Sequence, residues 1–460
     1  MEDNFMPIND YTRTPLSWMP NRCDITYPQY LSLAALLERD ILSGELPAGT
    51  KLPAQRSLAD YLDLHFTTVT RAYDLCREKR LIYGEIGRGT FVAPRSRLDL
   101  DAQNIFELGV VLGFPAITQE IVETAREVLS RSYCRALFSY TERTGMEHQR
   151  LAAVQWMAKR GVHTDIEHTA VFGGAQSAIT TALLSLFHMG DAIATDVFTY
   201  ANLIGAARLA HIRLVPIAGD IHGMSPDALD AACRKSRITG IFLMPDCANP
   251  TTIRISESRR DALAAVCKRY DLIIIEDDAS ITPGKHHTFY ARLPEQTFYI
   301  AAATRHLAPG LRITFAAFPG KWKAAITEGL YLTSIKASTL DAEIMSHLIL
   351  SRKDESILHE KQTLAVHANQ IYQKIFPHDP QGDETALFFR MHPLVDHIPG
   401  RNWEAYALSR GVRVCHSYRF LVDKKPAPSF LRISLSSTRH MEELEHALLR
   451  LKEIETDIKV

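Results

Sequence analysis

The sequence has few of the features that define special classes of protein. Its seven cysteines are an odd, scattered set without a Cys-x-x-Cys pair, which argues against a disulfide framework and against a zinc site. No stretch approaches the roughly 20 apolar residues that a membrane-spanning helix needs. The first residues lack a basic region followed by an apolar run, so no signal peptide is predicted. We therefore expect a cytoplasmic protein with no bound metal and no membrane partner.

A large net charge is also missing. The formal net charge of −1 gives no overall field that would attract nucleic acid, so any contact with DNA must come from a local surface. The hydrophobic fraction of 46% and the charged fraction of 23% are those of an ordinary globular protein. At 460 residues the chain exceeds what one core usually organises, and we expect two or three domains.

Residues 27–94 have the pattern of three helices followed by a hairpin. Leucine and isoleucine recur at helical spacing through 31–42, and two further amphipathic helices are predicted within 52–64 and 67–80. Two β-rich runs interrupted by glycines predict a hairpin in 81–94. This order is that of a winged helix-turn-helix, whose third helix enters the major groove of DNA.

The third helix carries its own start signal and a buried stripe. Thr67 or Thr68 is predicted to cap it, because a threonine side chain can accept from a free backbone N–H at a helix start. One face is predicted to be buried: Val69, Ala72, Tyr73 and Cys76.

Two motifs in this module resemble the GntR family of DNA-binding regulators. The pattern G-x-L-P-A-G-x-x-L-P-x-x-R-x-L-A runs from Gly44 to Ala59, and G-R-G-T-F-V runs from Gly87 to Val92. His65-Phe66 replaces a frequent Ser-Arg pair, which removes one expected contact with DNA. The local charge of 31–95 is only +1, so a protein-interaction module stays open as an alternative. The resemblance implies DNA contact by six residues: Arg56, Thr67, Thr68, Arg71, Arg88 and Gly89.

The second half of the chain alternates compact apolar runs with helical segments. The runs, which are predicted strands, lie at 168–172, 192–195, 212–217, 240–245 and 272–277. Such an alternation predicts a mostly parallel sheet covered by helices on both faces, with ligands at the loops that follow the strands. The polar segment that precedes this half, at 95–105, is predicted to be an interdomain linker.

The segment from Thr304 to Arg312, T-R-H-L-A-P-G-L-R, resembles S-K-T-L-A-P-G-L-R of the MocR-type regulators. These are a GntR subfamily whose C-terminal half has the type I aminotransferase fold. In that family the lysine binds pyridoxal 5'-phosphate covalently, and the arginine seven positions later holds its phosphate. Arg305 stands at the lysine position here. A guanidinium stays protonated and cannot condense with an aldehyde. The nearest upstream lysine, Lys285, lies in a divergent segment.

The same resemblance implies the other members of a cofactor and effector site. Gly174, Ala175 and Gln176 form the phosphate turn, with Thr304, Arg305 and Arg312 opposite. Tyr200 stacks on the pyridine ring, Asn249 bonds the phenolic oxygen, and Asp277 pairs with the ring nitrogen. Tyr140 reaches the phosphate site of a second subunit, and Arg432 binds an effector carboxylate. The family's glycine is replaced by Thr252, and its later tyrosine is absent, because Ala279 and Ser280 stand there.

The expected architecture is therefore α/β. A winged helix-turn-helix (27–94) is joined by the linker to an aminotransferase-like large domain (106–330) and a small α+β domain (331–460). We expect a homodimeric transcriptional regulator that binds a double-stranded DNA operator and a small anionic or amino-acid-like effector, without catalysis. Either the cofactor is held non-covalently, or it is absent and Arg305 fills its space and pairs with another anion or Asp277. The alternatives are a pyridoxal-phosphate aminotransferase with an added DNA-binding domain, and an interaction scaffold.

Overall fold

The computed structural model describes residues 15–79, 81–85, 88–93, 105–114, 119–278, 287–377, 387–394, 400–423 and 427–459. The chain separates into two compact units, Met1–Ile105 and Phe106–Val460. Residues 95–104 of the predicted linker lie outside the described residues. Within the described ranges, no helix combines the length and the apolar character that a bilayer crossing requires.

The first unit is a three-helix bundle followed by a hairpin. Its elements are α1 (Gln29–Ser43), α2 (Gln55–Leu62), α3 (Phe66–Glu78), β1 (Ile82–Glu85) and β2 (Gly89–Val92). The two strands pair antiparallel, as predicted. α1 ends at Gly44, whose φ of 86° is a left-handed conformation that glycine adopts at little cost. The predicted stripe of α3, which includes Val69 and Tyr73, is fully buried against α1 and α2.

The predicted cap of α3 was wrong. The helix begins at Phe66, one residue earlier than the threonines suggested, and His65 is its N-cap. Nδ1 of His65 accepts from the backbone N–H of Thr67 at 3.4 Å and lies 2.7 Å from the Thr67 hydroxyl. An imidazole nitrogen can therefore replace the threonine oxygen as the acceptor for a free N–H of the first turn.

The second unit is built around a seven-stranded sheet with the order β4-β12-β11-β10-β9-β5-β6. Its strands are β4 (Thr169–Phe172), β5 (Ala192–Asp196), β6 (Arg213–Ile217), β9 (Gly240–Leu243), β10 (Ile273–Asp278), β11 (Thr297–Ala301) and β12 (Thr314–Ala317). β12 runs antiparallel to both of its neighbours, and the other pairings are parallel. The predicted mostly parallel sheet is confirmed, although β11 and β12 were not among the predicted strands.

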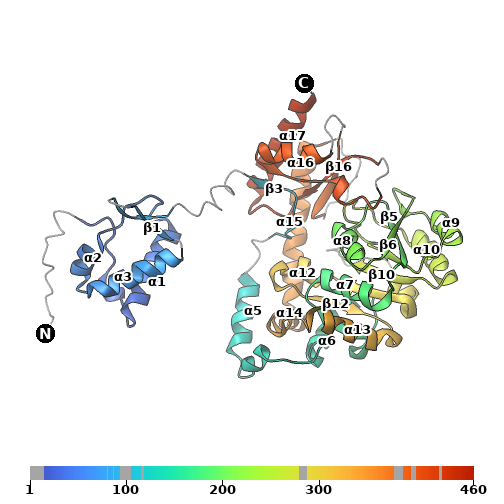
Figure 1. Cartoon of the computed structure of the whole chain (residues 1–460), viewed down its shortest axis with the longest axis horizontal. Helices are drawn as coiled ribbons and strands as arrows, with labels where there is room; N and C mark the ends of the chain where they lie inside the picture. Colours follow the sequence, from blue (N-terminus) through green and yellow to red (C-terminus); the bar gives the residue numbers. More distant parts are fainter. Residues whose placement is uncertain are drawn as a thin grey trace. The chain divides into compact units, whose positions relative to one another are not determined.

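Both faces of the sheet are buried, because successive residues of each strand enter different cores. Ile193, Phe242 and Ile275 join one cluster with α7 (Ala175–Leu186) and α8 (Ala201–Leu209), which we call the α7 face. Ala194 and Ile274 join the opposite cluster with α9 (Pro226–Lys235) and α10 (Glu257–Arg269), the α10 face. Figure 1 shows the strands between these helices.

A smaller α+β part follows. Its sheet has the order β13-β16-β15, formed by β13 (Phe389–Pro393), β15 (Cys415–His416) and β16 (Phe430–Ser434). The short strand β3 (Phe106–Glu107) pairs in parallel with β14 (Val412–Arg413), so the start of the unit packs on its C-terminal part. The long helix α15 (Lys353–Ile375) leads into this part (Figure 1).

The remaining helices surround these two sheets. They are α5 (Gln119–Ser130), α6 (Glu147–Ala158), α11 (Phe289–Arg292), α12 (Ala303–His306), α13 (Lys323–Ser334), α14 (Thr339–Leu350), α16 (Gly400–Ser409) and α17 (Met441–Lys459). A two-stranded ribbon, β7 (Gly219–Asp220) with β8 (Gly223–Met224), follows β6.

Candidate functional site

The turn between β4 and α7 forms an anion cradle with a distant arginine. Gly174 has a φ of 93° and a ψ of 163°, a conformation that is essentially reserved for glycine. A β-carbon placed on Gly174 would lie 2.8 Å from Nη2 of Arg312. The guanidinium of Arg312 therefore lies against this bare backbone at the N-terminus of α7. The helix dipole and the arginine charge add there, and both favour a bound anion.

Two side chains in the first turn of α7 have polar atoms without a partner. The buried Oγ of Ser177 and Oε1 of Gln176 make no hydrogen bond to any described residue. Gly174 supplies no side-chain cap, so the backbone N–H groups of this turn are also left for another acceptor. Ser177 is the last residue of the phosphate-turn motif Gly173–Ser177 that the resemblance indicated. The hydroxyl of Ser177 and the free backbone N–H groups are donors that suit a phosphate.

The loop that resembles the family's lysine segment contains α12 and a short 3-10 helix, Pro309–Leu311. Arg312 ends this helix with a φ of 54°, which is rare for a residue other than glycine and places its side chain beside Gly174. The side chains of Thr304 and Arg305 lie outside the described part of the structure. His306, by contrast, is fully buried.

A buried lysine packs behind this loop and was not predicted. Lys361 of α15 is 1% exposed, and its Nζ donates to the carbonyl oxygen of Leu307 at 3.0 Å. Burial lowers the pKa of Lys361 to about 8. Its hydrogen bond fixes the backbone two residues after Arg305. Lys361 is the one buried amine that the described residues bring to this loop.

Three successive acidic residues end β10, and the alternation of the strand sends them to different faces. Glu276 accepts the backbone N–H groups of Phe289 and Tyr290, each at 2.9 Å, and burial raises its pKa to about 8. Asp278 accepts from the hydroxyl of Tyr299 at 2.6 Å. Asp277 is 4% exposed and, like Ile275, belongs to the α7 face. The middle carboxylate therefore lies on the side where the anion cradle is built.

The predicted effector arginine contacts the predicted cofactor asparagine. Nη1 of Arg432 donates to Oδ1 of Asn249 at 3.1 Å, and Nη2 donates to the carbonyl oxygen of Gly109. The guanidinium also lies 5.0 Å from the ring centre of Phe420. Gly109 was not predicted, because nothing in its local sequence signals a contact with β16.

The replacement of a family glycine by Thr252 has a structural consequence. Thr252 has a φ of 60°, which is unusual for a β-branched residue, and the Asn249–Pro250 peptide before it is cis. Its N–H donates to the carbonyl oxygen of Ala248 at 2.6 Å. The loop thus keeps the left-handed turn that a glycine would favour, and holds Asn249 at 2% exposure.

Two predicted aromatic residues lie in different settings. Tyr200 is the N-cap residue of α8, and its half-buried ring packs against the apolar cluster of the α7 face. Its hydroxyl accepts from the amide of Asn202 at 3.1 Å. Tyr140 is 83% exposed.

The residues predicted to bind DNA lie on the surface of the first unit, where Arg56, Arg71 and Arg88 are all exposed. The guanidinium of Arg71 lies 4.0 Å from the ring centre of Tyr30, and that of Arg56 lies 5.8 Å from the ring centre of Phe66. Phe66, which replaces the arginine that is frequent in the family, therefore provides an aromatic ring on which Arg56 packs.

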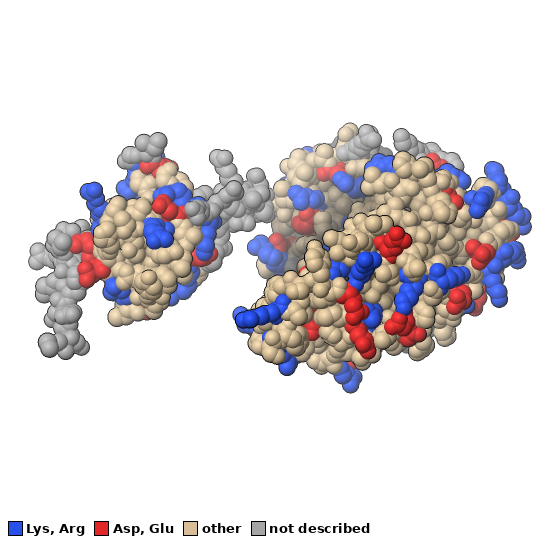
Figure 2. Space-filling view, turned by 60° about the horizontal axis from the view of Figure 1, so that its bottom comes forward, with Lys and Arg blue, Asp and Glu red and all other residues tan. Residues whose placement is uncertain are grey.

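At the hairpin end of this surface, the predicted DNA-binding residues already contact other residues of the unit. Arg88 pairs with Glu85 at 3.2 Å, and Gly89 has a φ of 120° with Lys51 packed over it. Thr67 is exposed and Thr68 is half-buried at the start of α3. On the face that Figure 2 shows, the first unit carries both basic and acidic side chains.

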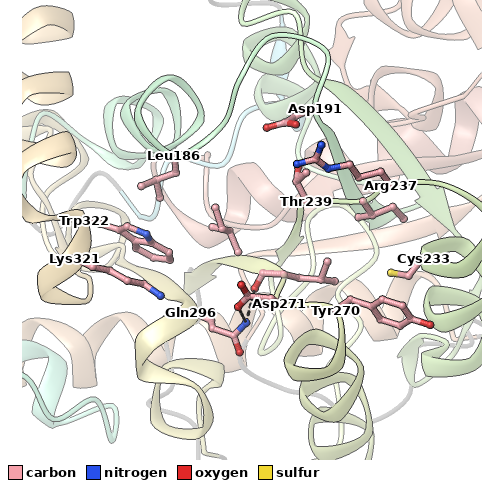
Figure 3. A pocket seen from close by; sticks show the side chains of 13 residues that line it. Leu186, Asp191, Cys233, Arg237, Thr239, Tyr270, Asp271, Gln296, Lys321 and Trp322 are labelled. Atoms are coloured by element: carbon pink, nitrogen blue, oxygen red, sulfur yellow. Dashed lines mark hydrogen bonds between the residues drawn. The ribbon is translucent and has the colours of Figure 1, made fainter.

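A separate hollow of about 650 Å³ opens at the amino ends of β9, β10 and β11. Figure 3 shows its labelled side chains, among which the amide of Gln296 donates to the carboxylate of Asp271 at 2.8 Å. Both acidic and basic groups line it, including Asp191, Arg237 and Lys321. It contains none of the predicted site residues, and it lies at the opposite edge of the sheet from the loops that carry them.

Fold and site together define a winged-helix module joined to an aminotransferase-type domain. Residues 29–92 match the family model of bacterial regulatory proteins, gntR family, and residues 110–346 match aminotransferase class I and II. The chain belongs to the HTH-type transcriptional regulators in which these two domains are fused, and it is a DNA-binding regulator.

Relatives in sequence support this assignment. The HTH-type transcriptional regulator YdeF of Bacillus subtilis is 33% identical over 462 residues, covering 98% of this chain and 100% of the relative. MocR of Rhizobium meliloti, named as a probable rhizopine catabolism regulatory protein, is 25% identical over 335 residues, covering 64% and 66%.

Solved structures confirm the fold of the second unit. The α-aminoadipate aminotransferase LysN of Thermus thermophilus superimposes with a TM-score of 0.69 at 17% identity, covering 79% of this chain and 95% of that chain. The kynurenine aminotransferase of Pyrococcus horikoshii gives a TM-score of 0.70 at 18% identity, covering 78% and 93%. The predicted combination of a winged helix and a type I aminotransferase fold is therefore confirmed.

Proposed function

We propose that this regulator is of the MocR type and that its aminotransferase-like domain senses a ligand without catalysing transamination. The proposal is supported by two observations together: the anion-binding turn is present, and the lysine is absent from its expected position. The anion cradle of Gly174 and Arg312 is built, whereas Arg305 stands where the reaction needs a lysine. A transaminase requires an amine that releases and recaptures the cofactor and moves a proton between carbons. A guanidinium supplies neither function.

Pyridoxal 5'-phosphate fits the described residues as a non-covalent ligand. The cradle and Ser177 would hold its phosphate, Asp277 its ring nitrogen and Asn249 its phenolic oxygen. When bound, such a cofactor supplies an electron-withdrawing ring and a reactive aldehyde. In the second alternative the cofactor is absent, and Arg305 pairs with another anionic effector or with Asp277.

Arg432 is proposed to bind the carboxylate of the effector. Its planar guanidinium suits a bidentate contact, and it already makes hydrogen bonds to Asn249 and Gly109 that a carboxylate would replace. An effector changes DNA binding only if it prefers one arrangement of the protein over another. Arg432 offers such a difference, because its bonds with and without the effector are not the same.

A homodimer is proposed for the working form in the cytoplasm, bound to a double-stranded operator. Tyr140 and Phe138 are 83% and 70% exposed, which leaves two aromatic rings available to a second subunit. In the proposed dimer, Tyr140 would contact the phosphate of the second subunit across the interface. Two winged helices in one dimer would read two half-sites.

The DNA-binding surface is tested by Arg71→Ala in a gel shift at fixed salt. Loss of a contact to a base edge should weaken operator binding by about 5- to 150-fold, that is about 1–3 kcal/mol. Arg22→Ala is the matched control, because Arg22 is exposed in the same unit but outside α3. Unchanged binding by Arg71→Ala, or equal loss in both variants, would contradict the assignment of α3 as the recognition helix.

The loss of catalysis is tested by borohydride reduction with added pyridoxal 5'-phosphate, followed by peptide mass mapping. The wild-type protein should retain no cofactor on residues 303–312 or on Lys361. Arg305→Lys should retain one on the peptide that contains the new lysine. A cofactor fixed to any wild-type lysine in this pocket would instead support the aminotransferase alternative.

A further inference from the structure

A second, smaller pocket lies at the carboxyl ends of β5, β6 and β9. Its volume is about 250 Å³, and most of its walls are apolar. The lining residues include Asp196, Ile217, Met244, Ile253, Ile255 and Pro428. None of the predicted cofactor or effector residues lines it. Asp196 shares the face of Ala194, so it points to the α10 face, whereas Asp277 belongs to the α7 face.

Asp196 is the distinctive group of this pocket. Its carboxyl makes no hydrogen bond or ion pair with any residue that the structure describes, and burial raises its pKa to about 7. Asp220 also lines the pocket, but its carboxylate bonds Arg259 at 2.9 Å and the N–H of His222 at 2.8 Å. Asp196 is half-buried, and a partly desolvated carboxyl group without a partner is costly to the fold; such groups concentrate where a ligand supplies the partner.

We propose that this pocket is a second ligand site, and that it takes a compact apolar molecule carrying an amine. The amine would donate to the Asp196 carboxylate, and the apolar body would fill the space between Ile217, Ile253 and Met244. A carboxylate ligand is disfavoured, because it would face Asp196 without a described basic side chain in the lining. The volume lies just below the usual range of small-molecule sites, which limits the ligand to a small one.

The pocket touches both sides of the contact between Asn249 and Arg432. Ala248 and Thr251 line it and flank Asn249–Pro250 in the chain. Pro428 lines it and lies shortly before β16, which carries Arg432. A ligand here therefore packs on the loop and the segment whose side chains meet at 3.1 Å. Occupancy would bias that contact, which makes this a place for a second effector, separate from the cofactor-like site.

The test titrates the purified full-length protein with 2-phenylethylamine by isothermal calorimetry at about pH 8, where Asp196 is ionised and the amine protonated. Two probes of the same shape, 2-phenylethanol and 3-phenylpropanoate, replace the amine by a neutral donor and by an anion. The amine should bind at one site with a Kd on the order of 0.1–1 mM. The alcohol should bind at least about tenfold more weakly, and the anion should not bind measurably.

Three variants locate the site. Asp196→Asn should weaken amine binding by at least about tenfold, because a charged acceptor is lost. Ile253→Phe should abolish binding by filling the pocket. Asp227→Asn, on the exposed first turn of α9, is the matched control and should bind as the wild type does. Equal binding of the three probes, unchanged affinity in Asp196→Asn, or no saturable binding by the wild type would each overturn the proposal. None of these outcomes depends on DNA binding.

Discussion

Replacing Gly174 by alanine tests the anion cradle most directly. The backbone at φ 93° and ψ 163° lies in a region that residues with a β-carbon adopt at a cost of about 1–3 kcal/mol. At about 2.1 cal/mol/K per residue, unfolding the unit Phe106–Val460 has an entropy near 0.7 kcal/mol/K. The midpoint of thermal unfolding should therefore fall by about 1–4 °C.

The same substitution should affect anion binding more than stability. The new β-carbon would lie 2.8 Å from Nη2 of Arg312, so the guanidinium must move away from the helix N-terminus. Loss of one charge-assisted hydrogen bond weakens binding by about 10- to 150-fold. Calorimetric titration with pyridoxal 5'-phosphate, and separately with inorganic phosphate, measures this loss.

Gly173→Ala is a matched control, because a β-carbon on Gly173 would meet no atom within 4 Å. It should leave both the unfolding midpoint and anion affinity close to those of the wild type. Equal effects of the two substitutions would refute the reasoning, since only Gly174 touches Arg312. Failure of the wild type to bind either anion would also refute it.

Two further predictions use buried groups whose pKa values are shifted. Folded Asp196 keeps its proton to about pH 7, whereas the unfolded chain releases it near 3.8, so the folded state binds more protons between these values. The free energy of unfolding therefore falls as the pH rises through that window, by at most about 4 kcal/mol. Urea unfolding at pH 5 and 7.5 measures this fall, and Asp196→Asn should remove it. Folded Lys361 loses its proton at about pH 8, whereas the unfolded chain holds it to 10.5, so the unfolded state binds more protons. Stability should rise by at most about 3 kcal/mol from pH 8 to 10.5, and Lys361→Met should abolish the rise. A pH dependence identical to the wild type in either variant would contradict the burial argument for that residue.

Of the five strands of the large sheet that were predicted, β4, β5, β9 and β10 are buried along nearly their whole length, and the edge strand β6 is only partly buried. Ala192–Ala194 and Ile273–Ile275 are continuous apolar runs, as is typical of parallel strands covered by helices. β12, Thr314–Ala317, was not among the predicted strands, although β5, which also contains two alanines, was. Its place in the sheet comes from pairing with β4 and β11 rather than from its own composition.

The cap of α3 shows how a local preference can mislead. Threonine is a better N-cap than histidine by propensity, and Thr67 and Thr68 both stood at the start of the apolar pattern. The helix nevertheless begins at Phe66, so the threonines lie inside its first turn and His65 accepts from the N–H of Thr67. The N-cap lies two residues before Thr67, at His65, and this shift changed which side chain faces the free N–H groups.

Motifs in the sequence identified candidate site residues, but they could not predict which of these residues contact one another. Gly174 and Arg312 are far apart in the chain, and only the fold puts the guanidinium against the glycine. Lys361 and Gly109 carry no local signal at all, because a lysine on a helix and a glycine in a loop are ordinary. Their roles follow from hydrogen bonds to Leu307 and Arg432, which arise from packing between distant segments.

The hydrogen bond from Arg432 to Asn249 also orients the amide. Because the guanidinium has only donors, it must face Oδ1, which leaves Nδ2 of Asn249 as the free donor of that amide. A donor is what an anionic phenolic oxygen requires, so under the proposed function Arg432 would prepare the cofactor side of the pocket. An effector carboxylate that takes Arg432 would remove this orientation. Linkage is reciprocal, and a bound cofactor must therefore weaken the effector by the same factor. Competition of this kind needs no covalent chemistry.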